Sequence, residues 1–473
     1  MKYLKLSLIS LLFLVCNTYS FAQYDIKIEI SDSKDTAIIL GYYYLDKTYA
    51  LDTAWNKNNT FTFKDKTKKL ETGIYFFSDL KGRFVEMMIQ GEDKVRLKTK
   101  DEDWNKFMQV KSSSKEMKAY FDYMKFSDEI GKKFQEISKQ NLDKEARDKE
   151  LKKLSKINDS IKLAFIEQYP NYLLSKVFNA TKQITIPEFE VPKKEDGTPD
   201  SLKWNTERWY YYKNHYFDNI DLTSTGLLRT PKMVFYETYN RYWNDVMKYE
   251  RTDSIIHYAH KVISMAQNSK GMKRFLIHNI TERYLQSPYM GHDKIYVELI
   301  KAYYETGIAD WVSPSDIEKN VERAHKWENI LIGKQVPDLA CMDSASVWHN
   351  LNSCNKDYKI LLFWSPGCGH CSVEIPKYDK FYKEKKNAYS FEVFAINTES
   401  DLEAWKKFIQ DKDLQWINLN GLVANYDWRE YFDIEKTPIM FILDKNNTIV
   451  AKNVPADNIE NIFKALKDGR IIF

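Results

Sequence analysis

The stretch LLFWSPGCGHCSVEIP, residues 361–376, holds two cysteines with two residues between them, directly after a run of apolar residues. The run at residues 359–364 has the composition of a buried central strand, and the residues from Gly369 onward are predicted to form a helix. Cys368 then lies at the turn between the strand and the helix, and Cys371 lies one helical turn further on. Two cysteines in this setting form a redox couple, a metal clamp or a structural disulfide, and the surrounding sequence has to distinguish among these.

The region around the two cysteines alternates predicted strands and helices. Short apolar runs indicate the strands, and apolar residues at helical spacing indicate the helices between them. The predicted strands are 359–364, 391–397, 415–418, 439–443 and 448–452, and the predicted helices are 369–381, 401–410, 423–432 and 456–466. An alternation that ends in a hairpin and a helix indicates an α/β layer fold, which we assign to residues 331–473.

The position of Cys368 favours redox chemistry. The N-terminus of a helix carries partial positive charge and free amide donors, and both stabilise a thiolate. Cys368 is therefore the predicted attacking thiol, and Cys371 the resolving one. A protonated His370 between them would add positive charge and make the oxidised form easier to reduce, whereas the alternative is a partly exposed helix residue without a redox role.

A metal site would need two further ligands, which Cys341 and Cys354 could supply. Structural zinc sites generally use two closely spaced pairs of ligands, whereas these two cysteines are 13 positions apart. The strand–turn–helix setting also suits redox chemistry better than metal binding. We therefore expect a redox couple, with no metal ion and no cofactor.

Two further residues are candidates for the same site. Glu374 comes three residues after Cys371, which places it on the same helix face, where its carboxylate could exchange a proton with that thiol. The alternative for Glu374 is an ordinary surface residue. Pro438 precedes the strand predicted at 439–443, where it either breaks a sheet edge or is a cis-proline that presents the preceding backbone beside an active site.

These residues together resemble a known family. The pattern FW-x3-C-x2-C-x2-E-x-P is similar to that of the TlpA/ResA-like branch of the thioredoxin superfamily; here it comprises Phe363, Trp364, Cys368, Cys371, Glu374 and Pro376. The segment GKQVPD at residues 333–338 resembles the opening segment of that domain and of the related peroxiredoxins. Thr437-Pro438 matches the family's threonine and cis-proline opposite the cysteines.

The resemblance implies a thioredoxin fold and dithiol–disulfide exchange. It implies that Glu374 tunes the inner thiol, so the expected catalytic residues are Cys368, Cys371 and Glu374. The expected substrate-binding residues are Trp364, Gly369, His370, Thr437 and Pro438. The regions before residue 331 more loosely resemble the amino-terminal parts that accompany such domains in Bacteroidetes envelope proteins.

The sequence departs from the family at several positions. Gly367 replaces the tryptophan usual before the first cysteine, and Leu362 stands where thioredoxin has a buried aspartate. The dipeptide Gly369-His370 matches that of disulfide isomerases, which leaves the direction of electron flow open. Cys341 and Cys354 are additional, and they form a second disulfide, pack as two separate core residues, or relay electrons with Cys368.

The chain before residue 331 falls into two further regions. Residues 23–105 show short alternating runs with turn-forming clusters between them, which predicts a small antiparallel β-sandwich. Residues 106–328 are predicted to be helical, with one apolar face at Leu151, Leu154, Ile157, Ile161 and Phe165. The aromatic-rich stretch 204–217 is expected to pack in a core, and His257 and His260 to be ordinary helix residues.

The first 22 residues predict an exported protein. They combine two lysines, an apolar core too short to span a bilayer, and Ser20-Phe21-Ala22 as a cleavage site, so we read residues 1–22 as a signal peptide. A lipid anchor at Cys16 is disfavoured because Val15 is too large for that motif. No other stretch is apolar enough for a transmembrane segment. The net charge of +4 in 473 residues argues against nucleic-acid binding.

We therefore predict a thiol–disulfide oxidoreductase of the periplasm or cell envelope. Its expected partners are client proteins with disulfides and a membrane-bound electron donor, and the reductive direction is preferred. One alternative is an envelope binding protein with an auxiliary thioredoxin domain. Another is a peroxiredoxin-like peroxidase, but the pattern P-x3-[ST]-x2-C fails because Pro366 lies only two residues before Cys368.

Overall fold

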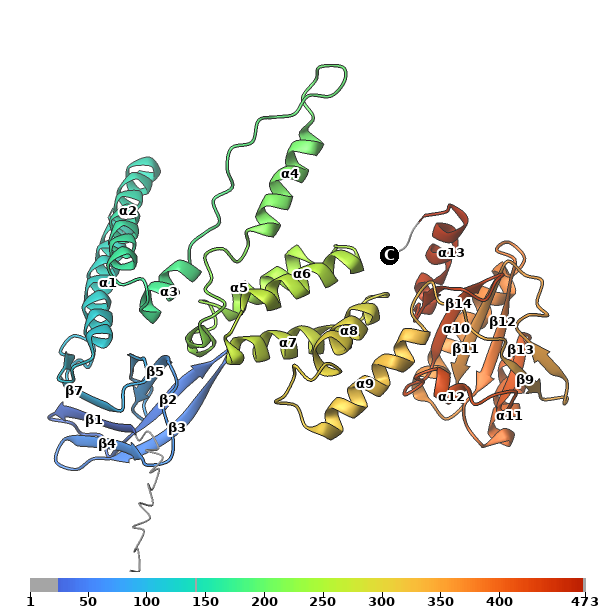
Figure 1. Ribbon diagram of the computed structural model, residues 1–473, viewed down its shortest axis with the longest axis horizontal. Coiled ribbons are helices and arrows are strands. Elements are labelled where there is room, and N and C mark those ends of the chain that lie inside the picture. Colours follow the sequence, from blue (N-terminus) through green and yellow to red (C-terminus); the bar gives the residue numbers. More distant parts are fainter. Residues whose placement is uncertain (1–23, 141–142, 471–473) are drawn as a thin grey trace, which may run out of the picture. The chain divides into compact units, whose positions relative to one another are not determined.

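The computed structural model describes residues 24–140 and 143–470 (Figure 1). The chain divides into two compact units, Met1–Val246 and Met247–Phe473, and each is described here by itself. The boundary between the units falls inside the region 106–328 that was predicted as one helical domain, so helices belong to both. The predicted signal peptide at residues 1–22 lies outside the described residues.

The first unit begins with two four-stranded sheets, in the orders β4-β1-β7-β8 and β3-β2-β5-β6. Their strands are β1 (Tyr24–Ser31), β2 (Ala37–Tyr44), β3 (Lys47–Trp55), β4 (Thr60–Asp65), β5 (Gly73–Ser78), β6 (Phe84–Ile89), β7 (Lys94–Lys100) and β8 (Gln109–Val110). The predicted alternation is confirmed in β1, where Ile26, Ile28 and Ile30 are buried. The expectation of a purely antiparallel arrangement is wrong, since β1 and β7 pair in parallel. Along the sequence between β1 and β7, the chain forms β2, β3, β5 and β6 of the other sheet. This provides the long connection that a parallel pair of strands needs.

Strand β3 is the one long strand of this region that the sequence did not predict. Most of its residues are exposed, so the apolar alternation that marks a half-buried strand is missing. It forms instead by pairing with β2 through a tight turn, where Leu45 adopts a positive φ of 57°. Backbone pairing with a buried neighbour therefore determines this strand.

The helices of the first unit follow the sheets. They are α1 (Lys115–Lys139), α2 (Lys144–Gln168), α3 (Leu173–Ala180), α4 (Ser201–Asn214), α5 (Tyr236–Arg241), a short 3-10 helix (Thr225–Arg229) and a π-helical turn (Tyr242–Val246). Helix α2 carries the predicted apolar stripe, but no residue of the helix is fully buried, and Ile157 remains 48% exposed. The apolar stripe is therefore present on α2, but its residues are not packed into a fully buried core.

Core packing of the aromatic-rich stretch 204–217 is only partly observed. Tyr216 and Phe217, after the end of α4, are buried, whereas Trp209 and Tyr210 on the helix are 41% and 51% exposed. The long loop before α4 accounts for part of this, because the Trp204 indole donates to the carbonyl of Phe189 in that loop at 3.0 Å. The helix thus packs on its own loop more than on a domain core.

The second unit contains helices and a mixed sheet. Its helices before the sheet are α6 (Thr252–Met265), α7 (Lys270–Leu285), α8 (Asp293–Leu299), a π-helical turn (Ile300–Tyr304) and α9 (Pro314–Asn329). Their facing sides bury aliphatic and aromatic residues such as Ile255, Leu276 and Tyr296. His260, which we expected to be an ordinary helix residue, contacts the Tyr303 hydroxyl at 2.8 Å through Nδ1.

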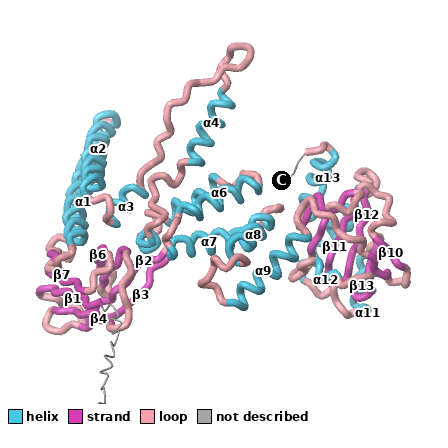
Figure 2. The backbone as a smooth tube through the Cα atoms, viewed as in Figure 1, coloured by secondary structure: helices cyan, strands magenta, loops and turns pink. Residues whose placement is uncertain are grey.

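Seven strands in the order β10-β9-β13-β12-β11-β14-β15 form the sheet, and Figure 2 shows helices on both sides of it. The strands are β9 (Ala340–Asp343), β10 (Trp348–Asn350), β11 (Tyr358–Trp364), β12 (Phe391–Asn397), β13 (Ile417–Ala424), β14 (Ile439–Asp444) and β15 (Ile449–Lys452). The helices are α10 (Gly369–Lys385), α11 (Leu402–Lys412), α12 (Trp428–Tyr431), a 3-10 turn (Ala456–Asn458) and α13 (Ile459–Lys467). The central strand β11 is buried from its second residue to its last, as predicted.

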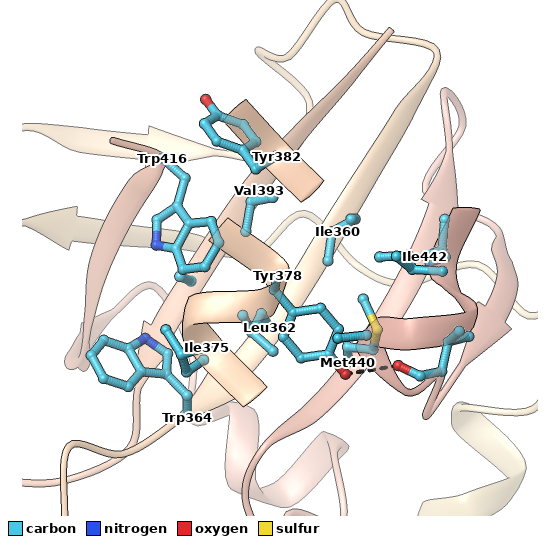
Figure 3. Close-up of a cluster of buried hydrophobic side chains, with 14 of the residues drawn as sticks. Ile360, Leu362, Trp364, Ile375, Tyr378, Tyr382, Val393, Trp416, Met440 and Ile442 are labelled. Carbon is cyan, nitrogen blue, oxygen red and sulfur yellow. Dashed lines mark hydrogen bonds between the residues drawn. The ribbon is translucent and has the colours of Figure 1, made fainter. Parts of the chain in front are cut away.

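Each face of this sheet has its own hydrophobic core. The cluster on the α10 side contains Leu362, Trp364, Ile375, Tyr378 and Met440 (Figure 3). The cluster on the opposite face contains residues that alternate with these along the strands, including Leu361, Phe363 and Phe441. Successive residues of the apolar run at 359–364 thus pack alternately into the two cores, which explains why the run shows no alternation of apolar and polar residues.

One predicted helix is wrong. The sequence predicted a helix at 423–432, but β13 continues to Ala424 and α12 spans only Trp428–Tyr431. The reason is tertiary pairing, because β13 bonds to β9 on the side away from β12, and β9 was not predicted. Local periodicity could not reveal a partner that lies so far back in the sequence.

Gly421 of β13 offers a test of this packing. An added Cβ would press on the backbone carbonyl of Asn397 and lie 2.8 Å from Ile396 Cγ2, and neither neighbour is a flexible side-chain end. We expect Gly421→Ala to lower the free energy of unfolding by about 1–3 kcal/mol in urea unfolding of the full chain. Gly369→Ala is the matched control, because nothing lies within 4 Å of its Cβ. Equal stability of the two variants would contradict the packing described.

Candidate functional site

Cys368 is the N-cap residue of α10, at the end of the turn that follows β11. The amide of Cys371 donates to Cys368 Sγ at 3.4 Å, and Cys368 Sγ donates to the carbonyl oxygen of Thr437 at 3.1 Å. The two thiols are not bonded to each other. The start of α10 and the segment just before β14 therefore meet at the sulfur of Cys368. The sequence predicted both the helix start and the strand start at these positions.

The surroundings of Cys368 stabilise its thiolate. Burial raises the pKa of this thiol, but hydrogen-bond donors lower it by more, so the net pKa lies below the ordinary value of a cysteine. The donors are the side chain of Thr437, the amide and thiol of Cys371, and the amide of His370. Both amides belong to the first turn of α10, as expected for a helix N-terminus.

Cys371 has the opposite character. It is fully buried in the core on the α10 side of the sheet, and burial raises the pKa of its thiol to about 12. The backbone amide of Ser365 partly opposes this shift. These pKa shifts favour the thiolate form of Cys368 over that of Cys371, which stays protonated at neutral pH. This asymmetry is what a two-step exchange of disulfide bonds requires.

The peptide bond between Thr437 and Pro438 is cis, so the second of the two roles considered for this proline is the observed one. The strand β14 begins at the next residue and runs antiparallel to β11, with Ile439 opposite Phe363. This register brings the Thr437 carbonyl to the edge of the sheet where β11 ends and α10 begins.

Glu374 lies one turn after Cys371 on α10, but its carboxylate has other partners. One oxygen accepts from Lys377 Nζ at 2.8 Å, and the other accepts from the amide of Ala456 at 3.3 Å. The side chain is one-quarter exposed. The role of Glu374 in proton transfer therefore stays a proposal.

The other predicted site residues differ in exposure. Gly369 and His370 are exposed at the start of α10, within reach of a large partner. Trp364 is fully buried, and its ring packs on Phe408 with 5.0 Å between ring centroids. A client could not contact the indole without opening the core, so the structure places Trp364 beneath the site and corrects the expectation of direct contact.

Glu399 and Ser365 were not among the site residues predicted from the sequence. The buried Ser365 hydroxyl donates to the Glu399 carboxylate, and a Cβ on Gly367 would lie 3.2 Å from both carboxylate oxygens. Glu399 thus anchors the turn that leads to Cys368, in space left by the absent side chain of Gly367. The sequence did contain a signal that these two residues lie close together. Ser365 follows β11 and Glu399 follows β12, and the carboxyl ends of neighbouring parallel strands lie at the same edge of a sheet.

Cys341 and Cys354 are free thiols in the structure, and Cys341 is a fully buried residue of the core. Of the alternatives raised for them, the structure therefore shows two separate thiols. Within residues 24–140 and 143–470, no group of three or more histidine, cysteine, aspartate or glutamate side chains is arranged to hold a metal ion.

Comparison with known proteins gives one match to a family model and several to solved structures. Residues 355–449 match the model of a family described as thioredoxin-like. A domain of a possible thiol-disulfide isomerase from Cytophaga hutchinsonii is 32% identical, with 29% of this chain and 95% of that chain covered and a TM-score of 0.28. No curated protein matches this chain.

Two further solved structures come from Bacteroides. A thioredoxin-like protein from Bacteroides caccae is 18% identical, with 59% of this chain and 99% of that chain covered and a TM-score of 0.46. A thiol-disulfide oxidoreductase from Bacteroides fragilis is 22% identical, with 28% of this chain and 99% of that chain covered and a TM-score of 0.24.

The two pKa shifts predict selective alkylation. Because the thiolate is the reactive form, iodoacetamide should modify Cys368 at neutral pH and leave Cys371 unmodified. The rate at Cys368 should rise with pH to a plateau whose midpoint lies below that of free cysteine. Mass spectrometry of the tryptic peptide 360–377 measures this in the Cys368→Ser and Cys371→Ser variants. Equal rates at the two thiols would contradict the assignment.

Proposed function

Since the C-terminal domain of this chain belongs to the thioredoxin-like family, as the resemblance predicted, we propose that the protein reduces disulfide bonds of client proteins outside the cytosol. The fold is that of thiol–disulfide oxidoreductases, preceded by a β-rich and a helical region. One observation carries the proposal: the Cys368 sulfur lies at a helix N-terminus, beside the Thr437 carbonyl, with Cys371 buried behind it.

The reaction proceeds in two displacements. The Cys368 thiolate attacks one sulfur of the client disulfide, forms a mixed disulfide and releases the other client sulfur as a thiolate. Cys371 then loses its proton and attacks Cys368 Sγ, which releases the second client sulfur and leaves a Cys368–Cys371 disulfide. Two electrons pass to the client in each cycle. The backbone before Pro438 and the exposed Gly369-His370 are the proposed client contacts.

A reductant has to restore the dithiol after each cycle. We assign this role to a membrane-bound electron donor, because the proposed compartment lacks the thiol-reducing systems of the cytosol. The proposed location in the periplasm or cell envelope rests on the pattern of residues 1–22. Across residues 24–140 and 143–470, no helix is both long and apolar enough to cross a membrane.

The two alternatives are less well supported. A peroxidase would need a hydroxyl residue and a proline in a spacing that Pro366 and Cys368 do not have. A binding protein with an inactive domain would not need a Cys368 thiol of lowered pKa beside a second, buried cysteine. A Cys368→Ala variant that kept full cellular function would favour the binding protein.

The two-step order predicts a trapped intermediate. Cys371→Ser removes the resolving thiol, so this variant should accumulate a mixed disulfide with insulin, visible on non-reducing gels. Cys368→Ser should form none, because the remaining thiol is buried and protonated at neutral pH. Cys354→Ser is the matched control and should behave as the wild type. Adducts of equal yield in both active-site variants would reject the proposed roles.

The proposed role of Glu374 predicts a slower second step. Glu374→Gln keeps an acceptor for the Ala456 amide but cannot take the proton of Cys371. We expect resolution of the mixed disulfide to slow by about 100-fold or more, with a weaker dependence on pH below neutrality, in stopped-flow measurements. Lys377→Met, which removes the partner of the same carboxylate, should change the rate little. A Glu374→Gln variant with wild-type resolution would leave this residue structural.

A further inference from the structure

A cavity of about 730 Å³ lies inside the second unit, between its helices and its sheet. One wall comes from the end of α7, the loop at residues 286–291 and helix α9. The other wall comes from residues 433–436 and from strands β14 and β15. The volume is in the range of pockets that bind ligands, and none of the described residues that line it is a cysteine.

The cavity adjoins the reactive site along one segment of chain. Lys436 and Ile439 line it, and they flank Thr437 and Pro438 on either side. The Thr437 carbonyl in turn lies 3.1 Å from Cys368 Sγ. A polypeptide held at this carbonyl in an extended conformation advances about 7 Å over two residues, so a client side chain about two residues away is the one that we expect at the cavity.

Side chains from the sheet domain and the helices hold the two walls together. Buried Lys452 of β15 binds Asp293 of α8 and donates to the carbonyl of Ile330 at 2.8 Å. The Trp327 indole of α9 donates to Asp433 at 2.6 Å, and Arg323 pairs with Glu435 at 2.7 Å. The residues just before Thr437 are thus fixed to α9. The cavity is formed before any partner binds, which reduces the entropic cost of binding.

The lining favours an apolar group with a negative charge at the rim. Tyr289, Trp327 and Ile439 supply aromatic and aliphatic surface, and Tyr289 is half exposed. The carboxylates of the lining are paired with Arg323 or Lys452. Among the described residues that line the cavity, exposed Lys436 is the cation without a carboxylate partner.

We propose that this cavity selects clients by their sequence: it takes a large apolar or aromatic side chain about two residues from the attacked cysteine, and Lys436 favours an acidic residue beside it. The inference rests on the proposed reductase function and adds a specificity site to it. The helical segment before the sheet domain is then a wall of the client groove. The rate at which a client disulfide is reduced would then depend on which client side chains reach this wall.

The test uses the reduced full chain and short peptides that carry one cysteine bonded to thionitrobenzoate. Cys368 attacks the peptide sulfur, a protein–peptide disulfide forms, and thionitrobenzoate leaves as a coloured thiolate. Peptides with phenylalanine or glycine two positions from the cysteine, on either side, give the apolar preference. Peptides with aspartate or lysine beside that position give the charge preference, and Cys368→Ala gives the background from other thiols.

We expect the phenylalanine peptide to react about tenfold faster than the glycine peptide. Tyr289→Ala should reduce this ratio to about two, and Tyr289→Trp should restore it. Tyr249→Ala, an exposed tyrosine of the same unit outside the cavity, is the matched control and should keep the ratio. The aspartate peptide should exceed the lysine peptide by about two- to fivefold at low salt, and Lys436→Glu should reverse this order.

Bis(2-hydroxyethyl) disulfide, a small disulfide with neither an aromatic ring nor a charge, separates the cavity proposal from the reductase proposal. If the wild type reacts with it but shows no preference among peptides, the cavity proposal is overturned and the reductase proposal stands. If Cys368 reacts with neither, the proposed function itself fails. A preference that survives Tyr289→Ala unchanged would also overturn the assignment of the cavity.

Discussion

Burial of strand β11 on both faces of the sheet is the constraint on which the site depends, because this strand brings together the hydrogen-bond partners of the Cys368 sulfur. The amide of Cys371 donates to this sulfur from the first turn of α10, and the Thr437 carbonyl accepts from it on the other side. Both partners are there because of β11. The strand ends where α10 begins, and its antiparallel pairing with β14 brings Thr437 to the same edge of the sheet. Burial of β11 on both faces holds this edge in place.

The chemical consequence is a separation of roles between two identical side chains. Donors around Cys368 lower the pKa of its thiol, and burial raises the pKa of the Cys371 thiol to about 12. In the proposed reaction, the first thiol attacks, and the second reacts only after its proton is removed. Glu374 is the candidate for that step, while Glu399 fixes the turn that leads from β11 to Cys368 through Ser365. A site of this kind needs neither a metal nor a cofactor for exchange of disulfide bonds.

The sequence predicted the parts of the fold whose signal is local. The buried strand β11, the start of α10 and the strand after Pro438 are in the predicted places, because apolar runs, a helix N-terminus and a proline each mark their own position. Strands β3 and β9 were missed because pairing with distant strands forms them. The exposure of Trp209 was also hidden, since a periodic pattern does not say which face of a helix a neighbour covers. Glu399 was missed because it lies far from the cysteines in the sequence, in the loop after β12.

The most direct test of the account is the reduction potential of the Cys368–Cys371 pair in the full chain. The protein would be equilibrated in glutathione buffers, and the alkylated thiols of peptide 360–377 counted by mass. The account predicts a single two-electron couple with a potential near or below about −250 mV, at the reducing end of the thioredoxin range. A potential at or above about −180 mV would contradict the reductase assignment and indicate an isomerase or an oxidase.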